Sequence, residues 1–152
     1  MRSLKFAALA AAIVGCGAVV AWAATPEEQV KQREEAMETF GDSAKILTGF
    51  VRDGRGSIDD VKAATAKMAQ VSAELPTLFP EGTAVGIGKS AAKSEVWTNQ
   101  ADFQTKVKGA QDAIAALDAA AQSGDAAKVK AAFPIVGQAC GACHETYRVK
   151  KS

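Results

Sequence analysis

The chain has 152 residues, of which 48% are hydrophobic, 23% charged and 6% aromatic, and its formal net charge is +1. These values are typical of one globular domain, and they argue against a largely disordered chain or a strongly basic nucleic-acid-binding protein. Three cysteines are too few for a disulfide scaffold, and a single histidine excludes every site that needs two imidazoles, such as a bis-histidine haem or a three-histidine zinc site.

The first 23 residues are typical of a secretory signal peptide. Arg2 and Lys5 precede a run of uncharged, mostly apolar residues that ends in the A-x-A cleavage site Ala21-Trp22-Ala23. We therefore expect cleavage before Ala24 and export to the periplasm. The alternative is an uncleaved membrane anchor, although the run is rich in small residues and barely long enough to span a bilayer. Cys16 only loosely resembles a lipoprotein signal and is expected to leave with the leader.

The sequence of the mature chain, residues 24–152, predicts an all-helical protein. Removal of Arg2 and Lys5 leaves 16 Lys and Arg against 17 Asp and Glu, a net charge of −1. Alternating β-branched runs are absent, and Ala, Lys, Glu, Gln and Asp dominate. The first helix is expected from about Pro26 to Arg52, with Thr25 as its N-cap. Its apolar stripe consists of Val30, Met37, Phe40, Ala44, Leu47 and Val51.

The second helix is expected to begin at Ser57, with Asp60 as a capping-box partner, and to stop at Pro76. A loop rich in Pro and Gly follows over about residues 76–93. Within it, Gly88-Lys89-Ser90 looks like the end of a phosphate-binding loop, but the required earlier glycine and the preceding strand are both missing. The stripe of this helix is Val61, Met68, Val71 and Leu75.

The third helix is expected to begin after the cap Ser94 and to end at Gly124, and the fourth to begin after the cap Asp125. Pro134 falls inside the fourth helix and is expected to bend it. Four amphipathic helices with short connections predict an antiparallel up-down-up-down four-helix bundle. The third stripe is Val96, Phe103, Val107, Ala110, Ile114, Leu117 and Ala121; the fourth is Val129, Phe133, Val136, Cys140, Cys143 and Tyr147.

The strongest motif is Cys140-Gly141-Ala142-Cys143-His144, the C-x-x-C-H pattern of covalent haem attachment. Two thiols three residues apart on a helix can both form thioethers with the haem vinyl groups, and the adjacent imidazole then reaches the iron from the same side. A thioredoxin-like redox pair belongs instead at the start of a helix that follows a strand. A zinc site needs a second Cys/His pair, which the chain lacks. We therefore expect one covalent haem c inside the bundle.

The chain resembles the class II c-type cytochromes, the cytochrome c-prime family, over residues 24–152. The resemblance lies in the run 140–148, in residues 30–37 (Val-Lys-Gln-Arg-Glu-Glu-Ala-Met) and in residues 75–80 (Leu-Pro-Thr-Leu-Phe-Pro). High-spin members of that family have an apolar residue on the distal side of the haem, and a low-spin branch has Met there. The matching position in this chain is Met37.

Candidate sixth ligands are few because the chain has no second histidine. Met37 and Met68 both lie on apolar stripes, where methionine is ordinarily core packing. Their distances from the ends of their helices, about 16 Å and 12 Å, do not separate them. The family resemblance implies Met37 as the ligand opposite His144, with an open or otherwise filled site as the alternative.

Several charged and aromatic residues are expected near the haem. Arg148 lies four residues after His144, where the family carries Arg near the haem; a solvated helix-end charge is the alternative. Arg33 precedes Met37 by four residues and suits a haem propionate, or is a surface charge. Trp97 and Phe103 are expected to wall the haem. Four lysines form either a docking rim for an acidic redox partner or a scattered solvated surface: Lys89, Lys93, Lys150 and Lys151.

Three functions compete at this point. A Met–His iron suits a periplasmic single-electron carrier, because no coordination position is left for a substrate. The alternative is a five-coordinate cytochrome that binds NO or CO, and a helical protein without haem is the third possibility, which the C-x-x-C-H motif argues against. We expect an electron carrier and not an enzyme, with redox proteins as partners, no membrane span after cleavage, and a monomeric or homodimeric state.

Overall fold

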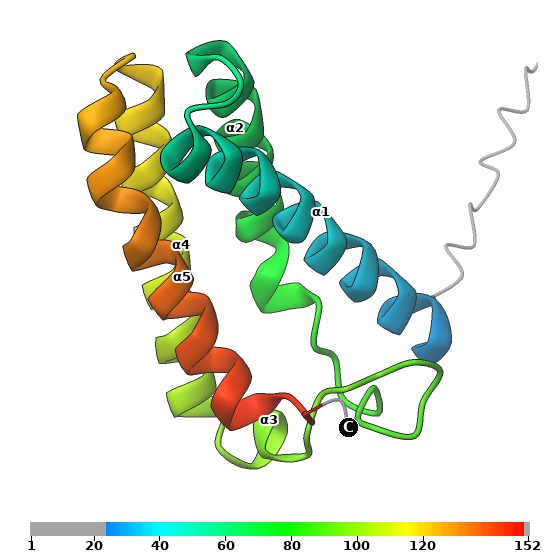
Figure 1. Ribbon diagram of the computed structural model, residues 1–152. Helices are drawn as coiled ribbons and strands as arrows, with labels where there is room; N and C mark the ends of the chain where they lie inside the picture. Colours follow the sequence, from blue (N-terminus) through cyan, green and yellow to red (C-terminus); the bar gives the residue numbers. More distant parts are fainter. Residues whose placement is uncertain (1–23, 151–152) are drawn as a thin grey trace, which may run out of the picture.

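The computed structural model describes residues 24–150. The predicted signal peptide and Lys151 lie outside the described residues. No helix among the described residues is both long enough and apolar enough to cross a bilayer. In chain order the helices are α1 (Pro26–Asp53), α2 (Ile58–Glu74), the 3-10 turn η1 (Leu75–Thr77), α3 (Glu95–Thr98), α4 (Gln100–Gln122) and α5 (Ala126–Tyr147) (Figure 1).

Three of the four predicted helix caps are confirmed: Thr25, Ser57 and Asp125. Thr25 and Ser57 each accept a hydrogen bond from the backbone N–H of the third residue of the helix that follows, and the carboxylates of Glu28 and Asp60 accept hydrogen bonds from the backbone N–H groups of these two caps. The second partner, Asp60, was predicted from the sequence. Asp125 accepts hydrogen bonds from the first turn of α5. These side chains satisfy backbone N–H groups that have no partner within the helix, so each helix starts where its cap stands.

The predicted third helix is divided, and its expected start at Ser94 is wrong for the long helix. Asn99 leaves the helical conformation, with φ −122° and ψ 50°, and separates the single turn α3 from α4. Ser94 makes no side-chain cap. The carbonyl of Asn99 accepts hydrogen bonds from Phe103 N and from the hydroxyl of Tyr147, so a contact with α5 stabilises the break. By contrast, α5 continues through Pro134 as one helix.

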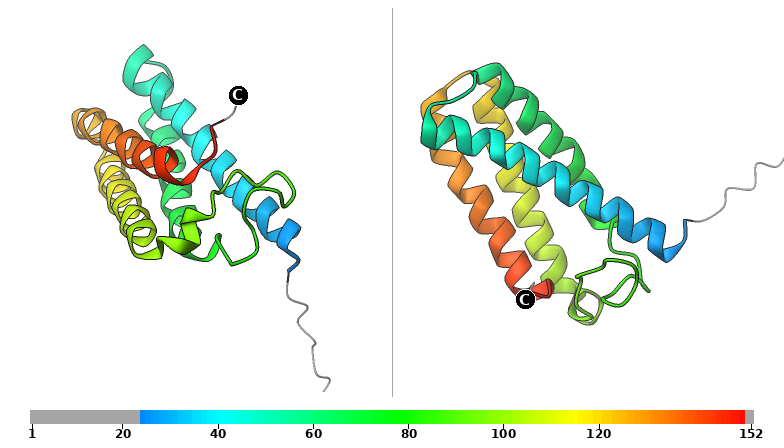
Figure 2. Two further views of the ribbon diagram at one scale, coloured as in Figure 1. Left: turned by 90° about the horizontal axis from the view of Figure 1, so that it is seen from below. Right: turned by 45° about the vertical axis from the view of Figure 1, so that its right-hand side comes forward.

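The four long helices form an antiparallel bundle in which α4 and α5 run side by side and α2 lies between α1 and α4 (Figures 1 and 2). The helix α1 diverges from α5 toward its own N-terminus, and the loop between η1 and α3 lies at this wide end of the bundle (Figure 2). The narrow end contains one core of buried residues and the wide end a second. The wide-end core consists of Ala36, Leu75, Leu78, Ala92, Val96, Phe103, Val107 and Tyr147. The narrow-end core consists of Leu47, Val61, Met68, Ile114, Leu117, Ala121, Val129 and Val136.

At the wide end, the C-terminus of α5 is anchored to the α3–α4 junction by Tyr147. Its hydroxyl donates to the Asp102 carboxylate at 2.6 Å, and its ring packs edge-on against Phe103, with the centroids 5.1 Å apart. Only 3% of Tyr147 is exposed. Burial, followed by the hydrogen bond to Asp102 and the charge of that carboxylate, raises the pKa of Tyr147 to about 12.

The tyrosine titration tests this anchor. Because the folded-state pKa lies above the ordinary value of 10.0, the stabilisation by Tyr147 is fully present below pH 10 and is lost as the pH rises toward about 12. Tyr147 is the only tyrosine, so tyrosinate absorbance should appear near pH 12 in the native protein and near pH 10 in urea. Asp102→Asn should lower the native value, because it removes a charge that opposes ionisation. A native midpoint equal to that in urea would contradict the anchor.

The narrow-end core is tested by two adjacent residues of α1. Leu47 is fully buried, so Leu47→Ala should lower the free energy of unfolding by about 2–5 kcal/mol through lost apolar burial and the cavity left behind. Ile46 is 45% exposed, and Ile46→Ala should change it by less than about 0.5 kcal/mol. Urea titration of both variants measures the difference, and equal losses would show that the burial pattern of α1 is wrong.

Candidate functional site

Three side chains of α5 line one cavity of about 790 Å³. The cavity lies between α1, α4 and α5 at the wide end of the bundle. Cys140, Cys143 and His144 all line it. Residues three and four apart lie on one face of a helix, so the C-x-x-C-H spacing brings both sulfurs and the imidazole to the same opening. The cavity is of the size that holds a ligand as large as a cofactor, since such pockets measure about 300–1,000 Å³.

The two cysteines are free thiols set in a largely apolar wall. Both are half-buried, and Cys143 packs against the wide-end core while Cys140 packs against the narrow-end core. Burial raises the pKa of both thiols, because the charged thiolate is poorly solvated there. The predicted core placement is therefore confirmed with one addition: both cysteines border an opening and are not enclosed.

His144 faces the same opening near the end of α5. Its desolvation, together with the positive charge of Arg148, lowers the pKa of the imidazole. A neutral imidazole keeps a nitrogen lone pair available for a metal. Arg148 also lines the cavity, and its backbone N–H donates to the His144 carbonyl at 3.1 Å although its own backbone is already extended. The predicted proximity of Arg148 to the site is confirmed, and its contact with a haem stays a prediction.

Met37 lines the cavity from α1, which forms the wall facing α5. Its side chain is partly buried and packs against the wide-end core. Met68, the competing candidate, is only 2% exposed, lies in the narrow-end core and does not line the cavity. Met68 is therefore a packing residue, as its position on an apolar stripe also suggested, and only Met37 shares the cavity with the C-x-x-C-H segment.

Arg33 is not a surface charge, which was the alternative interpretation. It is 5% exposed and lines the cavity one helical turn before Met37. Its two Nη atoms donate four hydrogen bonds to the loop after η1: to the carbonyls of Leu78 and Thr83 and to the hydroxyls of Thr83 and Ser90. Burial lowers its pKa. The propionate contact stays a prediction, with Nε as the one donor that these bonds leave over.

The aromatic wall differs from the one predicted. Phe103 lines the cavity as expected, but Trp97 does not; its indole N–H donates to the Phe79 carbonyl at 3.0 Å, behind the lining. Phe79 and Tyr147 line the cavity instead. Phe79 lies between Pro76 and Pro80, in the segment 75–80 of the family resemblance, and this location was the sequence signal for its role.

The charged residues at the opening are of both signs. Lys89 and Lys106 line the cavity together with Glu34 and Glu38. Lys106 was not predicted; it lies 3.8 Å from the Asp102 carboxylate. Lys93 is engaged with the Thr146 carbonyl, and Lys150 is exposed. A docking rim formed by the predicted lysines stays a prediction.

These residues fit a covalently held haem. The cavity has apolar and aromatic walls, two thiols and an imidazole on one helix, and a thioether on the opposite wall. A zinc site would need further ligands, and residues 24–150 contain no group of three or more His, Cys, Asp or Glu side chains able to hold a metal ion. The donor set is that of an iron porphyrin and not of a free ion.

Comparisons with known proteins agree with this fit. The family model described as Cytochrome C' matches residues 28–148. The chain is 38% identical to cytochrome c' from Pararhodospirillum photometricum over 126 residues, which are 82% of this chain and 99% of the relative. It is 34% identical to cytochrome c-554 from Cereibacter sphaeroides over 99% of both chains.

Solved structures show the same architecture. A cytochrome c' with ligand-controlled dimer dissociation superposes with a TM-score of 0.79, at 31% identity, over 85% of this chain and 100% of that chain. The nitric oxide complex of a leucine-to-alanine mutant of cytochrome c prime from Alcaligenes xylosoxidans gives 0.77, at 35% identity, over 86% and 100%. The chain therefore belongs to the cytochrome c' family, whose four-helix bundles carry one covalently attached haem c.

Proposed function

We propose that this chain is a monohaem electron carrier whose iron is ligated by His144 and Met37. One observation carries the proposal: Met37 is the methionine that lines the cavity into which the C-x-x-C-H segment opens, and it does so from the opposite wall. When bound, the haem supplies a one-electron ferric/ferrous couple.

The residues of α5 hold the cofactor and set its orientation. Cys140 and Cys143 supply the two thioether links, and His144 supplies the proximal nitrogen. All three belong to one regular helix that packs along α4 and ends at the Tyr147 anchor, so they move as one unit. Rigid attachment suits electron transfer, because little reorganisation then accompanies a change of charge.

The side chain of Met37 governs the distal side. A thioether is a soft, neutral ligand that favours ferrous iron and raises the reduction potential. Phe79 and Phe103 supply apolar surface beside it and limit the access of water. The proposal assigns no proton transfer and no nucleophile to the cavity residues, as expected for a carrier and not for an enzyme.

Binding of NO or CO is the second candidate, and the comparisons taken alone favour it. The related solved structures include nitric oxide complexes of cytochrome c prime from Alcaligenes xylosoxidans. Gas binding needs a distal position that is open or easily vacated. Met37 is the residue that separates the two candidates, because its sulfur either occupies that position or leaves it free.

We further propose export to the periplasm after removal of residues 1–23, with redox proteins as partners. The A-x-A site before Ala24 supports cleavage. The cytochrome c' relative from Pararhodospirillum photometricum aligns over 99% of its own length with only 82% of this chain, which leaves room for a removed leader. The related protein with ligand-controlled dimer dissociation makes a homodimer a natural alternative to a monomer.

Attachment and processing are tested together by mass. The intact exported protein should have the mass of residues 24–152 plus one haem, and acid–acetone extraction should leave the haem on the polypeptide. Cys140→Ala with Cys143→Ala should release all haem under the same extraction, since no thioether can form. Complete extraction from the wild-type protein would refute the covalent links, and a product that retains residues 1–23 would indicate an anchor.

Iron ligation is tested by exchanging one methionine at a time. Wild-type ferric protein should be low-spin and six-coordinate at neutral pH. Met37→Leu should convert it to a high-spin, five-coordinate form that binds CO readily. Met68→Leu is the matched control and should leave the spectrum unchanged, because Met68 lies outside the cavity. Both swaps nearly conserve volume and should cost less than about 1.5 kcal/mol of stability.

The outcomes separate the two candidates. A high-spin wild-type protein, or a spectrum that does not respond to Met37→Leu, would reject the Met–His carrier and support the gas-binding cytochrome. A low-spin wild-type protein that binds CO only slowly would support the carrier.

A further inference from the structure

At the wide end of the bundle, a buried arginine joins α1 to the loop after η1. Arg33 extends from α1 into the loop after η1 and uses both Nη atoms for four hydrogen bonds of 2.8 to 3.2 Å. Its guanidinium carbon also lies 4.8 Å from the centre of the Phe79 ring. Among residues 24–150, no carboxylate lies within ion-pair distance of Arg33, so neutral oxygens of the loop, rather than an acidic side chain, satisfy the guanidinium.

The groups that Arg33 binds are themselves held in place. Thr83 is fully buried, and its hydroxyl accepts from Arg33 and donates to the Pro80 carbonyl. The hydroxyl of Ser90 accepts from Arg33 and from Ala92 N, and donates to the Thr83 carbonyl. A buried network in which every member has partners is rigid.

The same loop continues to the end of α5. Ala92 and Arg148 form an antiparallel bridge, with Lys93 N bonded to the Tyr147 carbonyl at 2.9 Å and Val149 N to the Ala91 carbonyl at 2.8 Å. A continuous set of hydrogen bonds therefore runs from α1, through the loop, to the residues that follow His144. We call the segment 78–93 the strap.

The strap spans the two walls of the cavity. Arg33 lies one helical turn before Met37, and the bridge lies directly after the turn that carries His144. Toward the N-terminus of α1 these walls diverge, so direct packing between α1 and α5 does little to hold Met37 and His144 at a set separation (Figure 1).

We propose that Arg33, through Thr83 and Ser90, is a positioning residue that holds the Met37 wall against the His144 wall and thereby controls how readily the distal sulfur leaves the iron. The proposal rests on the Met–His ligation proposed above. Loss of the strap lets α1 move outward, which raises the fraction of molecules with an open distal position and so the rate at which an added ligand enters.

The test uses Thr83→Val in the haem-loaded protein. This change keeps the shape of the residue and leaves Arg33 and its charge in place, but removes the hydroxyl that Arg33 binds. The rate of CO binding to the ferrous protein should rise by about three- to tenfold, the range expected when a buried hydrogen bond is lost. Arg33→Lys should have a similar effect, since one ammonium cannot replace the two-pronged contact. The double variant should add little to either.

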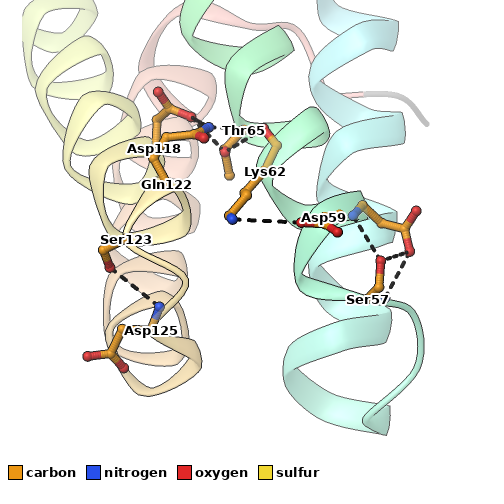
Figure 3. Close-up of polar contacts among 9 residues, drawn as sticks. Ser57, Asp59, Lys62, Thr65, Asp118, Gln122, Ser123 and Asp125 are labelled. Carbon is orange, nitrogen blue, oxygen red and sulfur yellow. Dashed lines mark hydrogen bonds and ion pairs between the residues drawn. The ribbon is translucent and has the colours of Figure 1, made fainter.

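Thr65→Val is the matched control. Thr65 is equally buried, and its hydroxyl donates to the Asp118 carboxylate at 2.7 Å between α2 and α4 (Figure 3). It does not line the cavity. The Thr65→Val variant should lose stability, as Thr83→Val does, but its CO rate should stay that of the wild-type protein. Ser90→Ala is the second strap variant if Thr83→Val fails to fold, and it should raise the CO rate in the same direction.

Amide hydrogen exchange distinguishes a failure of the strap from a failure of the ligation. In Thr83→Val, exchange should quicken at the amides of Val85, Lys93 and Val149, which the strap protects, and not in Thr65→Val. If amide exchange or the CO rate is unchanged in Thr83→Val, the proposed role of the strap is wrong. A CO rate that rises in Arg33→Lys but not in Thr83→Val also contradicts the proposed role of the strap, because Arg33 then acts directly on the cofactor. A high-spin wild-type spectrum instead rejects the Met–His ligation, whatever the exchange shows.

Discussion

A helical bundle that holds a large flat cofactor at one end cannot pack all its helices closely along their whole length. Here α4 and α5 remain in contact while α1 turns away, and the space that opens between them is the cavity. The narrow end supplies the continuous apolar core, with Leu47, Leu117 and Val129 fully buried. The continuous core and the candidate site thus lie at opposite ends of the bundle.

The two walls of the cavity at the wide end differ in how closely their helices pack. The C-x-x-C-H segment lies on the best-packed pair of helices, where attachment is rigid. The opposing residue, Met37, lies on α1, which has little contact with α5. The buried hydrogen bonds of Arg33 join this wall of the cavity to the loop after η1.

Much of the fold was predictable from local chemistry. Caps such as Ser57 with Asp60 announce helix starts, and apolar stripes at helical spacing predicted the buried residues. The division at Asn99 was not predictable, because a tertiary hydrogen bond from Tyr147 stabilises it. The predicted position of Trp97 in the cavity wall was wrong for a similar reason, because Trp97 lies in α3, on the other side of the break at Asn99 from α4. Arg33 looked like a surface or propionate-binding residue, since no local pattern reveals that a loop 50 residues away supplies its acceptors.

The cofactor class was predictable from the sequence alone, because C-x-x-C-H with a single histidine leaves little but a covalent haem, and spacing on one helix is a local property. The sequence also determined the number of long helices and their buried faces. Which of the two methionines lines the cavity could be seen only in the fold, since Met37 and Met68 both lie on apolar stripes at similar distances from their helix ends. Met37 lines the opening that the divergence of α1 from α5 creates, whereas Met68 packs in the narrow-end core.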